Sequence, residues 1–341
     1  MSVATASHRP LAHDIAAWLF AAAALFLVLK LRLLPALLAG LLVHELVHML
    51  APRLGVARLG HVRARLVAIA LLSSVVIFLL ALSAYGSMAF FRGELGSLPA
   101  LMQKMAESIE GARAMLPDWL AARLPTSIDD LAETMMRWLR AHAGEAQIIG
   151  AEAGRGLVHI LFGMIIGAMI SLSEAAAYAQ AKPLARALIE RAARLAASFR
   201  RIVFAQVRIA ALNAFFTWLY LDVALPLLDI HLPLAKTMVA VTFIVGLLPV
   251  VGNLVSNTVI VIVSLSHSVA VAVASLAFLV VIHKLEYFLN ARIVGSRIRA
   301  RTWELLLAML AMEAAFGVAG LIAAPIYYAY LKDELAARGQ V

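Results

Sequence analysis

The chain has 341 residues, of which 64% are hydrophobic and 14% are charged, and its mean hydropathy is +0.93. Soluble domains contain roughly 45–50% apolar and about 25% charged residues, so this composition excludes a soluble protein and predicts several membrane crossings. The net charge of +9 arises in short connections between apolar segments, as the positive-inside rule expects, and indicates no nucleic-acid partner. The absence of cysteine excludes disulfides and thiol chemistry.

Residues 1–90 are predicted to form an N-terminal segment of three spans, at 13–29, 33–51 and 66–90. The connection at 52–65 carries four arginines and no acidic residue. Because cytoplasmic connections are enriched in Lys and Arg, we expect this connection and the N-terminus to lie in the cytoplasm.

Residues 91–155 have charges of both signs, and Pro99, Pro117 and Pro125 punctuate them. Apolar residues recur there near helical spacing, which predicts two amphipathic helices. Acidic residues outnumber basic ones, in contrast to the cytoplasmic connections. We therefore interpret residues 91–155 as an extracytoplasmic amphipathic helical insertion.

Residues 156–341 are interpreted as the transport region. A span at 156–178 leads to a long helix that starts near Lys182 with a run of basic residues and continues into the membrane to Pro226. Broken apolar segments follow at 234–268 and 303–330, separated by a span at 269–283 and a basic loop at 284–301. The alternation of sides places the C-terminus in the cytoplasm with the N-terminus.

The segment 234–268 is interrupted by Pro249, which lacks a backbone donor, and by Gly252, which permits unusual dihedral angles. Its two arms, 235–247 and 254–266, are shorter than the roughly 20 residues that cross a bilayer. The pattern predicts a re-entrant-like hairpin, with one long kinked span as the alternative. Broken backbone at membrane depth must be buried in protein or line a wet cavity, so this bend is a candidate transport site.

The segment 303–330 repeats the pattern, with arms at 303–315 and 321–330 around Gly317 and Gly320. The two hairpins are expected to open from opposite faces of the membrane, as in an inverted repeat. The predicted fold is thus an all-α polytopic membrane protein with about six full spans plus two Gly/Pro-broken helical hairpins.

Four ionisable residues fall within predicted spans: Glu45, Arg208, Asp222 and Glu313. Such residues are costly in a membrane, and they indicate either function or pairing between helices. Arg208 and Asp222 are too far apart on one helix to pair directly, so each needs a partner elsewhere. Glu313 precedes the Gly317 break by one helical turn and is a candidate proton carrier, with a structural hydrogen bond as the alternative.

Asn253 and Asn257 are one helical turn apart just after the first break, so both amides can share a face of the second arm. Their amides could bind a polar solute or a cation. Alternatively, they satisfy backbone groups freed by the break.

His44, Glu45 and His48 match the HExxH pattern, in which two histidines bind Zn²⁺ and the glutamate acts as general base. A catalytic zinc needs a third protein ligand, and the sequence has no second acidic motif that would supply it. An intramembrane zinc protease is therefore one reading of the motif. The other reading is a polar patch at the inner end of the second span, with no metal.

Three runs carry a resemblance to a known family: Gly246-Leu-Leu-Pro249-Val-Val-Gly252-Asn253, then Leu285-Glu286-Tyr-Phe-Leu-Asn290-Ala-Arg-Ile-Val-Gly295, then Phe316-Gly317-Val-Ala-Gly320-Leu-Ile-Ala-Ala-Pro325. Together with Gln206 ahead of the fifth span, they resemble the autoinducer-2 exporter (AI-2E) family of permeases. The chain departs from the family pattern at Ala291 and at Trp303-Glu304. The resemblance implies a homo-oligomeric, pentameric transporter of the bacterial inner membrane that exports autoinducer-2 or exchanges sodium or lithium for protons.

We therefore expect an inner-membrane permease or exporter of a small polar solute, with no enzymatic activity and no cofactor. No Walker motif for ATP binding occurs. One alternative is a sodium(lithium)/proton antiporter, with H⁺ or Na⁺ as partner and with a membrane acid such as Glu313 or Asp222 as the proton carrier. The other is the zinc protease. The candidate pathway residues are Gln206, Arg208, Asn213, Asp222, Pro249, Gly252, Asn253, Asn257, Glu286, Asn290, Glu313, Gly317 and Gly320.

Overall fold

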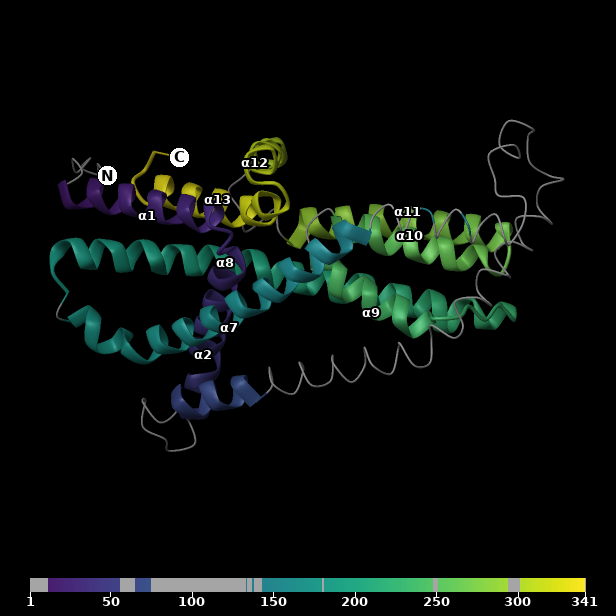
Figure 1. Cartoon of the computed structure of the whole chain (residues 1–341), viewed down its shortest axis with the longest axis horizontal. Helices are drawn as coiled ribbons and strands as arrows, with labels where there is room; N and C mark the ends of the chain where they lie inside the picture. The colour runs from purple at the N-terminus through teal and green to yellow at the C-terminus, as the bar shows by residue number, and fades with distance from the viewer. Residues whose placement is uncertain are drawn as a thin grey trace, which may run out of the picture. The chain divides into compact units, whose positions relative to one another are not determined.

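The computed structural model describes residues 12–55, 65–74, 143–179, 181–247, 251–293 and 301–340, with the single positions 133 and 137. The regular secondary structure of these residues is helical throughout (Figure 1). Among them, four stretches are long and apolar enough to cross a membrane: Ala12–Lys30, Leu34–Arg53, Gly154–Ser173 and Pro183–Leu228. The all-α architecture is confirmed for the described residues, and the total number of spans stays a prediction.

The chain forms two compact units, each described by itself. Unit 1 comprises Met1–Leu79, Ala151–Val203 and Arg297–Val341, and unit 2 comprises Leu80–Gly150 and Phe204–Ser296. Unit 1 holds α1 (Ala12–Lys30), α2 (Leu34–Gly55), most of α7 (Ala143–Ala179), the first part of α8 (Pro183–Trp218), α12 (Thr302–Phe316) and α13 (Val318–Ala336). Unit 2 holds the rest of α8, the π-helix η1 (Leu219–Ala224), the 3₁₀ turn η2 (Pro226–Leu228), α9 (Ala235–Gly246), α10 (Val251–Leu265) and α11 (Val269–Ile293).

Several boundaries differ from the predicted ones. Helix α7 begins at Ala143, within the stretch interpreted as the insertion, and the rest of that insertion lies almost entirely outside the described residues. Helix α11 runs on to Ile293, so the first part of the predicted loop at 284–301 is helical. No proline or glycine interrupts the chain between Lys284 and Ile293, which explains this continuation.

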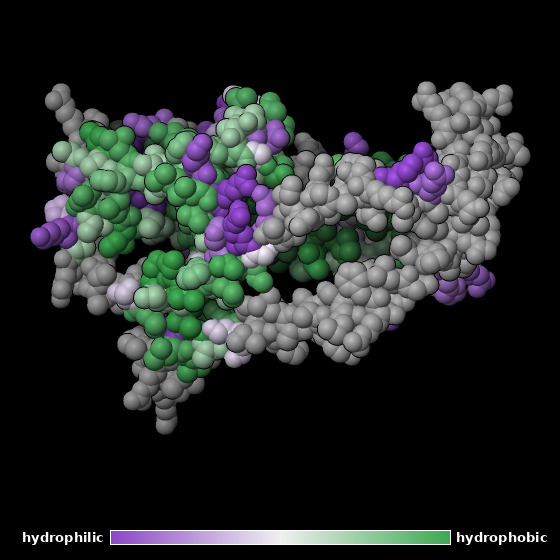
Figure 2. Space-filling view, in the orientation of Figure 1, coloured by the Kyte–Doolittle hydropathy of each residue, from purple (hydrophilic) through white to green (hydrophobic). Residues whose placement is uncertain are grey.

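Unit 1 exposes apolar side chains and buries polar ones. Leu19 of α1 is 68% exposed and Met169 of α7 is 64% exposed, whereas Glu45, Ser171 and Arg191 are buried. Hydrophobic side chains also cover much of the described surface in Figure 2. A bilayer would solvate such a surface, because lipid tails are as apolar as these side chains.

Helices α2 and α7 contact each other through their backbones. A Cβ atom added to Gly163 would lie 2.1 Å from the carbonyl oxygen of Ala36, and one added to Gly167 would lie 2.2 Å from that of Gly40. Small residues four apart allow such close packing between membrane helices. This interface was not predicted, although the spacing Gly163-Met-Ile-Ile-Gly167 inside an apolar stretch is its signal in the sequence.

Helices α12 and α13 form a hairpin in unit 1. Gly317 joins them with φ 63° and ψ −146°, a conformation that favours glycine. Gly320 then packs on the first arm, since an added Cβ would lie 1.9 Å from the carbonyl oxygen of Met312. The predicted break at 316–320 is therefore narrower than expected: α13 begins at Val318 and continues through Pro325 to Ala336.

In unit 2, α9, α10 and α11 pack one against the next (Figure 1). An apolar core that includes Leu221, Met238, Ile260 and Leu279 joins η1 to these three helices. The predicted outer turn at 229–233 lies between η2 and α9, with positive φ at Asp229 and Leu234. These contacts bring the end of α8 and η1 against the first hairpin.

Candidate functional site

The predicted pathway residue Gln206 contacts the end of the first arm. Its Nε2 atom donates a hydrogen bond of 2.8 Å to the carbonyl oxygen of Gly246, the last residue of α9. The last carbonyls of a helix have no partner within the helix, so Gln206 satisfies one of these groups. Gly246 itself packs closely on α8, since an added Cβ would lie 3.4 Å from the Cβ of Ala210.

The next polar link joins Asn213 of α8 to Asn253 of α10. Asn213 is 7% exposed, and its Nδ2 atom lies 3.4 Å from Oδ1 of Asn253. Two predicted pathway residues thus meet across a helix interface. Asn257, one turn further along α10, is half-buried.

A third link uses residues that the sequence analysis did not select. The hydroxyl of Tyr220 lies 3.0 Å from Oγ of Ser275 on α11, which lies 2.7 Å from Oγ of Ser264 on α10. Both serines are fully buried. Tyr220 also stacks on Phe278, with ring centroids 4.0 Å apart. The signal for this link in the sequence is the presence of serines within apolar helices, because hydroxyls buried there require partners.

Gln206, Asn213 and Tyr220 are spaced seven residues apart, which places them on one side of α8 and its continuation into η1. At the rise of an α-helix they extend over ~21 Å, a large part of the roughly 30 Å hydrocarbon core. We call these three residues, with Asn253, Ser264 and Ser275, the polar stripe. It consists of three separate polar contacts, made by uncharged donors and acceptors inside unit 2.

Asp222 follows Tyr220 by two residues in the π-helix η1, so its side chain points to a different side of the helix from the polar stripe. Its Oδ2 atom is buried and accepts no hydrogen bond from the residues that the structure describes. π-helical turns are rare, and they occur frequently at functional sites. Arg208, by contrast, is exposed on α8.

The structure changes the role of Gly252. Gly252 was predicted to lie in the bend and to allow unusual dihedral angles there, but it lies in the first turn of α10 and its φ is not positive. An added Cβ would lie 2.2 Å from the carbonyl oxygen of Val245 and 2.8 Å from Cα of Gly246. Glycine is therefore required for the close approach of α9 and α10, so the predicted reason was wrong.

Three other predicted pathway residues lie wholly or partly outside what the structure describes. Pro249 falls within 248–250, which lie outside the described residues. Glu286 and Asn290 lie on α11, but their side chains are outside the described part of the chain.

The hairpin of α12 and α13 places Glu313 on an exposed face. Trp303, Leu306 and Leu310 share that face and are 58–66% exposed. The backbone carbonyl oxygen of Glu313 accepts a hydrogen bond of 2.6 Å from the N–H of Gly317, at the end of α12.

An ion pair joins α12 and α13 at the end of the hairpin that lies away from Gly317. Glu304 near the start of α12 lies 3.0 Å from Nζ of Lys332 near the end of α13, and it also accepts a hydrogen bond from Tyr328. The hydrogen bond to Glu304 raises the pKa of the Lys332 ammonium. This pair involves Glu304, a position where the chain departs from the family pattern.

The HExxH residues lie together on α2 but engage other helices. Glu45 is 5% exposed and lies 3.4 Å from Nη1 of Arg200 on α8. Nδ1 of His44 lies 3.3 Å from Oγ of Ser171, and Nδ1 of His48 lies 2.8 Å from the carbonyl oxygen of His44. Within the described residues, no group of three or more His, Asp or Glu side chains could hold a metal. These contacts support the polar-patch reading.

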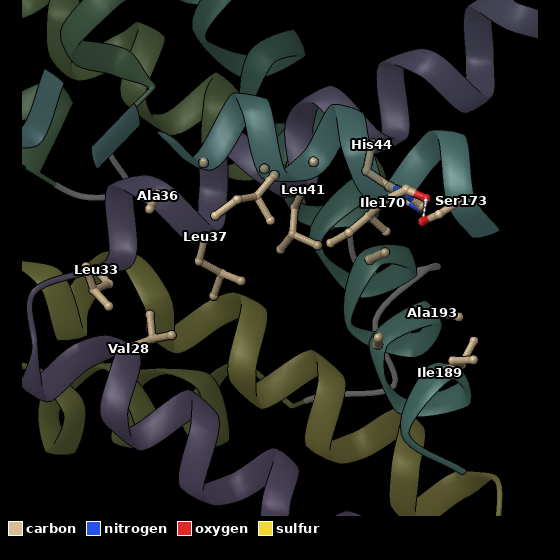
Figure 3. Close-up of a pocket in the computed structure, with 16 residues that line it drawn as sticks. Val28, Leu33, Ala36, Leu37, Leu41, His44, Ile170, Ser173, Ile189 and Ala193 are labelled. Carbon is tan, nitrogen blue, oxygen red and sulfur yellow. Dashed lines mark hydrogen bonds between the residues drawn. The ribbon is translucent and has the colours of Figure 1, made fainter. Parts of the chain in front are cut away.

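A cavity of about 400 Å³ adjoins this patch in unit 1. Figure 3 shows Val28 and Leu33 at one end and His44 with Ser173 at the other, and Leu37 and Leu41 lie between them. Its wall is otherwise apolar or made of small residues, so it offers space between helices and few polar groups.

Long apolar helices, buried polar contacts between them and exposed apolar surfaces define a polytopic helical membrane protein. The comparison with protein families then narrows the class. The family model of the AI-2E family transporters matches residues 15–337. The chain therefore belongs to this family and is a membrane transporter. No curated protein and no solved structure matches the chain.

Proposed function

We propose that the protein is a permease of the bacterial inner membrane that moves a small, uncharged, hydroxyl-bearing solute such as autoinducer-2. The polar stripe carries this proposal. Its amides and hydroxyls can both donate and accept hydrogen bonds, as a polyhydroxylated solute requires, and none of its members carries a charge. No Walker motif is present, so transport proceeds without ATP hydrolysis.

A second candidate function is sodium(lithium)/proton exchange, and Asp222 favours it. A buried carboxylate oxygen without a hydrogen bond is suited to take up a proton or a cation, since burial makes the uncompensated charge costly. Glu313, the residue that sequence analysis favoured, is exposed on α12. We therefore assign the coupling role in this alternative to Asp222.

Flux into proteoliposomes tests both candidates. Labelled autoinducer-2 should cross with the wild-type protein, and Asn213→Ala should slow its passage, because the variant removes one link of the polar stripe. Thr258→Ala is the matched control, since Thr258 is exposed on α10 and its hydroxyl donates to the carbonyl oxygen of Leu254 in the same helix. Solute flux absent in all proteins, with proton flux driven by a sodium gradient, would favour exchange instead.

The proposed assembly is the homopentamer that the family resemblance implies, with both termini in the cytoplasm. One contact supports a common side for the termini: Arg338, just after α13, lies 3.4 Å from Asp14 in the first turn of α1. Cross-linking of purified protein followed by mass measurement tests the pentamer, and a monomer at every protein concentration would refute it.

A further inference from the structure

Unit 1 contains a second cavity, of about 480 Å³, between α1, α12 and α13. Its volume falls within the roughly 300–1,000 Å³ of small-molecule sites. The body of the cavity is apolar, with Phe26, Leu29, Met312 and Phe316 among its lining residues. Its polar lining residues are Trp18, Tyr327, Tyr330, Glu334 and Gln340.

Glu334 is the decisive residue of this cavity. Only 6% of its surface is exposed. Its Oε2 atom accepts hydrogen bonds from Nε1 of Trp18 at 3.1 Å and from Nη1 of Arg194 at 2.7 Å, and the hydroxyl of Tyr330 lies close to the same carboxylate. Its Oε1 atom is buried and makes no hydrogen bond of ordinary geometry to the described residues. An unsatisfied buried acceptor is costly, so a donor supplied by a ligand would be favoured there.

Positive charge exceeds negative charge around Trp18, the lining residue that donates to Glu334. The guanidinium of Arg338 stacks on Trp18 at 3.9 Å and pairs with Asp14 at 3.4 Å. Arg191 pairs with the same carboxylate at 3.1 Å. Two guanidinium groups therefore share one aspartate, and this surplus positive charge suits an anionic group such as phosphate.

We propose that this cavity binds a membrane phospholipid with a primary-ammonium headgroup. An acyl chain occupies the apolar body, the ammonium donates to the Glu334 carboxylate, and the phosphate lies against Arg338. Trp and Tyr side chains at the polar part match the belts that such residues form at the level of lipid headgroups. This binding is independent of the transported solute and goes beyond the proposed function.

Native mass spectrometry of the full-length, delipidated protein tests the proposal directly. The protein is incubated with an equal mixture of ethanolamine, choline and glycerol phospholipids that carry the same acyl chains. Choline lacks N–H donors, and the glycerol headgroup lacks the positive charge. We expect roughly tenfold enrichment of the ethanolamine lipid, as a charge-assisted hydrogen bond implies. Equal binding of the three lipids, or a preference for the glycerol lipid, would overturn the proposal.

Two variants locate the site. Glu334→Gln keeps the size of the side chain but removes its charge, so the preference for ethanolamine should disappear. Ala22→Trp fills the cavity from α1 and should lower retention of every phospholipid, whereas Ala23→Trp, exposed and outside the lining, is the matched control. An ethanolamine preference that persists in both Glu334→Gln and Ala22→Trp would exclude this cavity. Because binding is measured without flux, its failure is distinguishable from failure of the transport proposal.

Discussion

Gln206 of α8 donates a hydrogen bond from Nε2 to the carbonyl oxygen of Gly246, across 2.8 Å and forty residues of sequence. Gly246 ends the first arm of the hairpin, where helix geometry leaves carbonyl groups without partners. The side chain of Gln206 therefore stabilises an interruption that would otherwise be unfavourable in a membrane. The same side chain belongs to the polar stripe, to which we assign solute passage, so one residue would serve both the hairpin and the proposed transport.

Gln206→Leu should destabilise the protein by roughly 1–3 kcal/mol, because the Gly246 carbonyl loses its donor while the side-chain volume is largely kept. Thermal unfolding of the purified protein measures the change. Val207→Ala, at the neighbouring and partly exposed position, should have a smaller effect. An unfolding midpoint for Gln206→Leu at or above that of the control would contradict this role.

Asn213→Ala and Asn253→Ala should each raise the apparent KM for the solute, and their effects should not add. Each variant removes the same link between α8 and α10, so the second substitution has little left to disrupt. A double-mutant cycle on flux kinetics measures this coupling. Fully additive effects would mean that the two amides act separately.

Gly252→Ala should already impair transport, although alanine is tolerated in ordinary helices. Its Cβ would approach the carbonyl oxygen of Val245 and force α9 and α10 apart. Gly252→Leu should insert and assemble, because the apolar arms are unaltered, but it should lose transport. Gly154→Ala is the control, since an added Cβ there has no neighbour within 4 Å. Wild-type flux in Gly252→Ala would refute the close approach.

If transport is coupled to cations, Asp222→Asn should abolish the dependence of flux on pH and sodium, because an amide cannot titrate. Glu313→Gln should retain that dependence, as its side chain lies on the exposed face of α12. Flux measured over a pH series with each variant distinguishes the two residues. The reverse result would return the coupling role to Glu313.

Cysteines introduced singly at Ser127 and Ser296 should be labelled from opposite faces of the membrane by an impermeant reagent. Both positions lie outside the described residues, and the prediction depends on charge: residues 91–155 are richer in acids, and residues 284–301 are richer in bases. The chain has no native cysteine to interfere. Labelling of both sites from one face would overturn the predicted topology.

Properties local to a segment were readable from the sequence. Apolar runs predicted α1 and α2 closely, and the Gly317 break and the family followed from short motifs. The arms of the first hairpin were also placed near α9 and α10. These features depend on the composition of neighbouring residues, because a helix forms its backbone hydrogen bonds within its own segment.

The partners of polar side chains were decided only by the tertiary structure. Glu45 pairs with Arg200 of another helix. Asn253 contacts Asn213 of α8, a partner that its spacing from Asn257 along α10 does not reveal. Gly252 is required because α9 lies against it, and Glu313 is exposed because the neighbouring arm packs on another side of α12. Each of these outcomes depends on which helices become neighbours and how they are rotated, and helix periodicity fixes the face that a residue shares but not what lies opposite it.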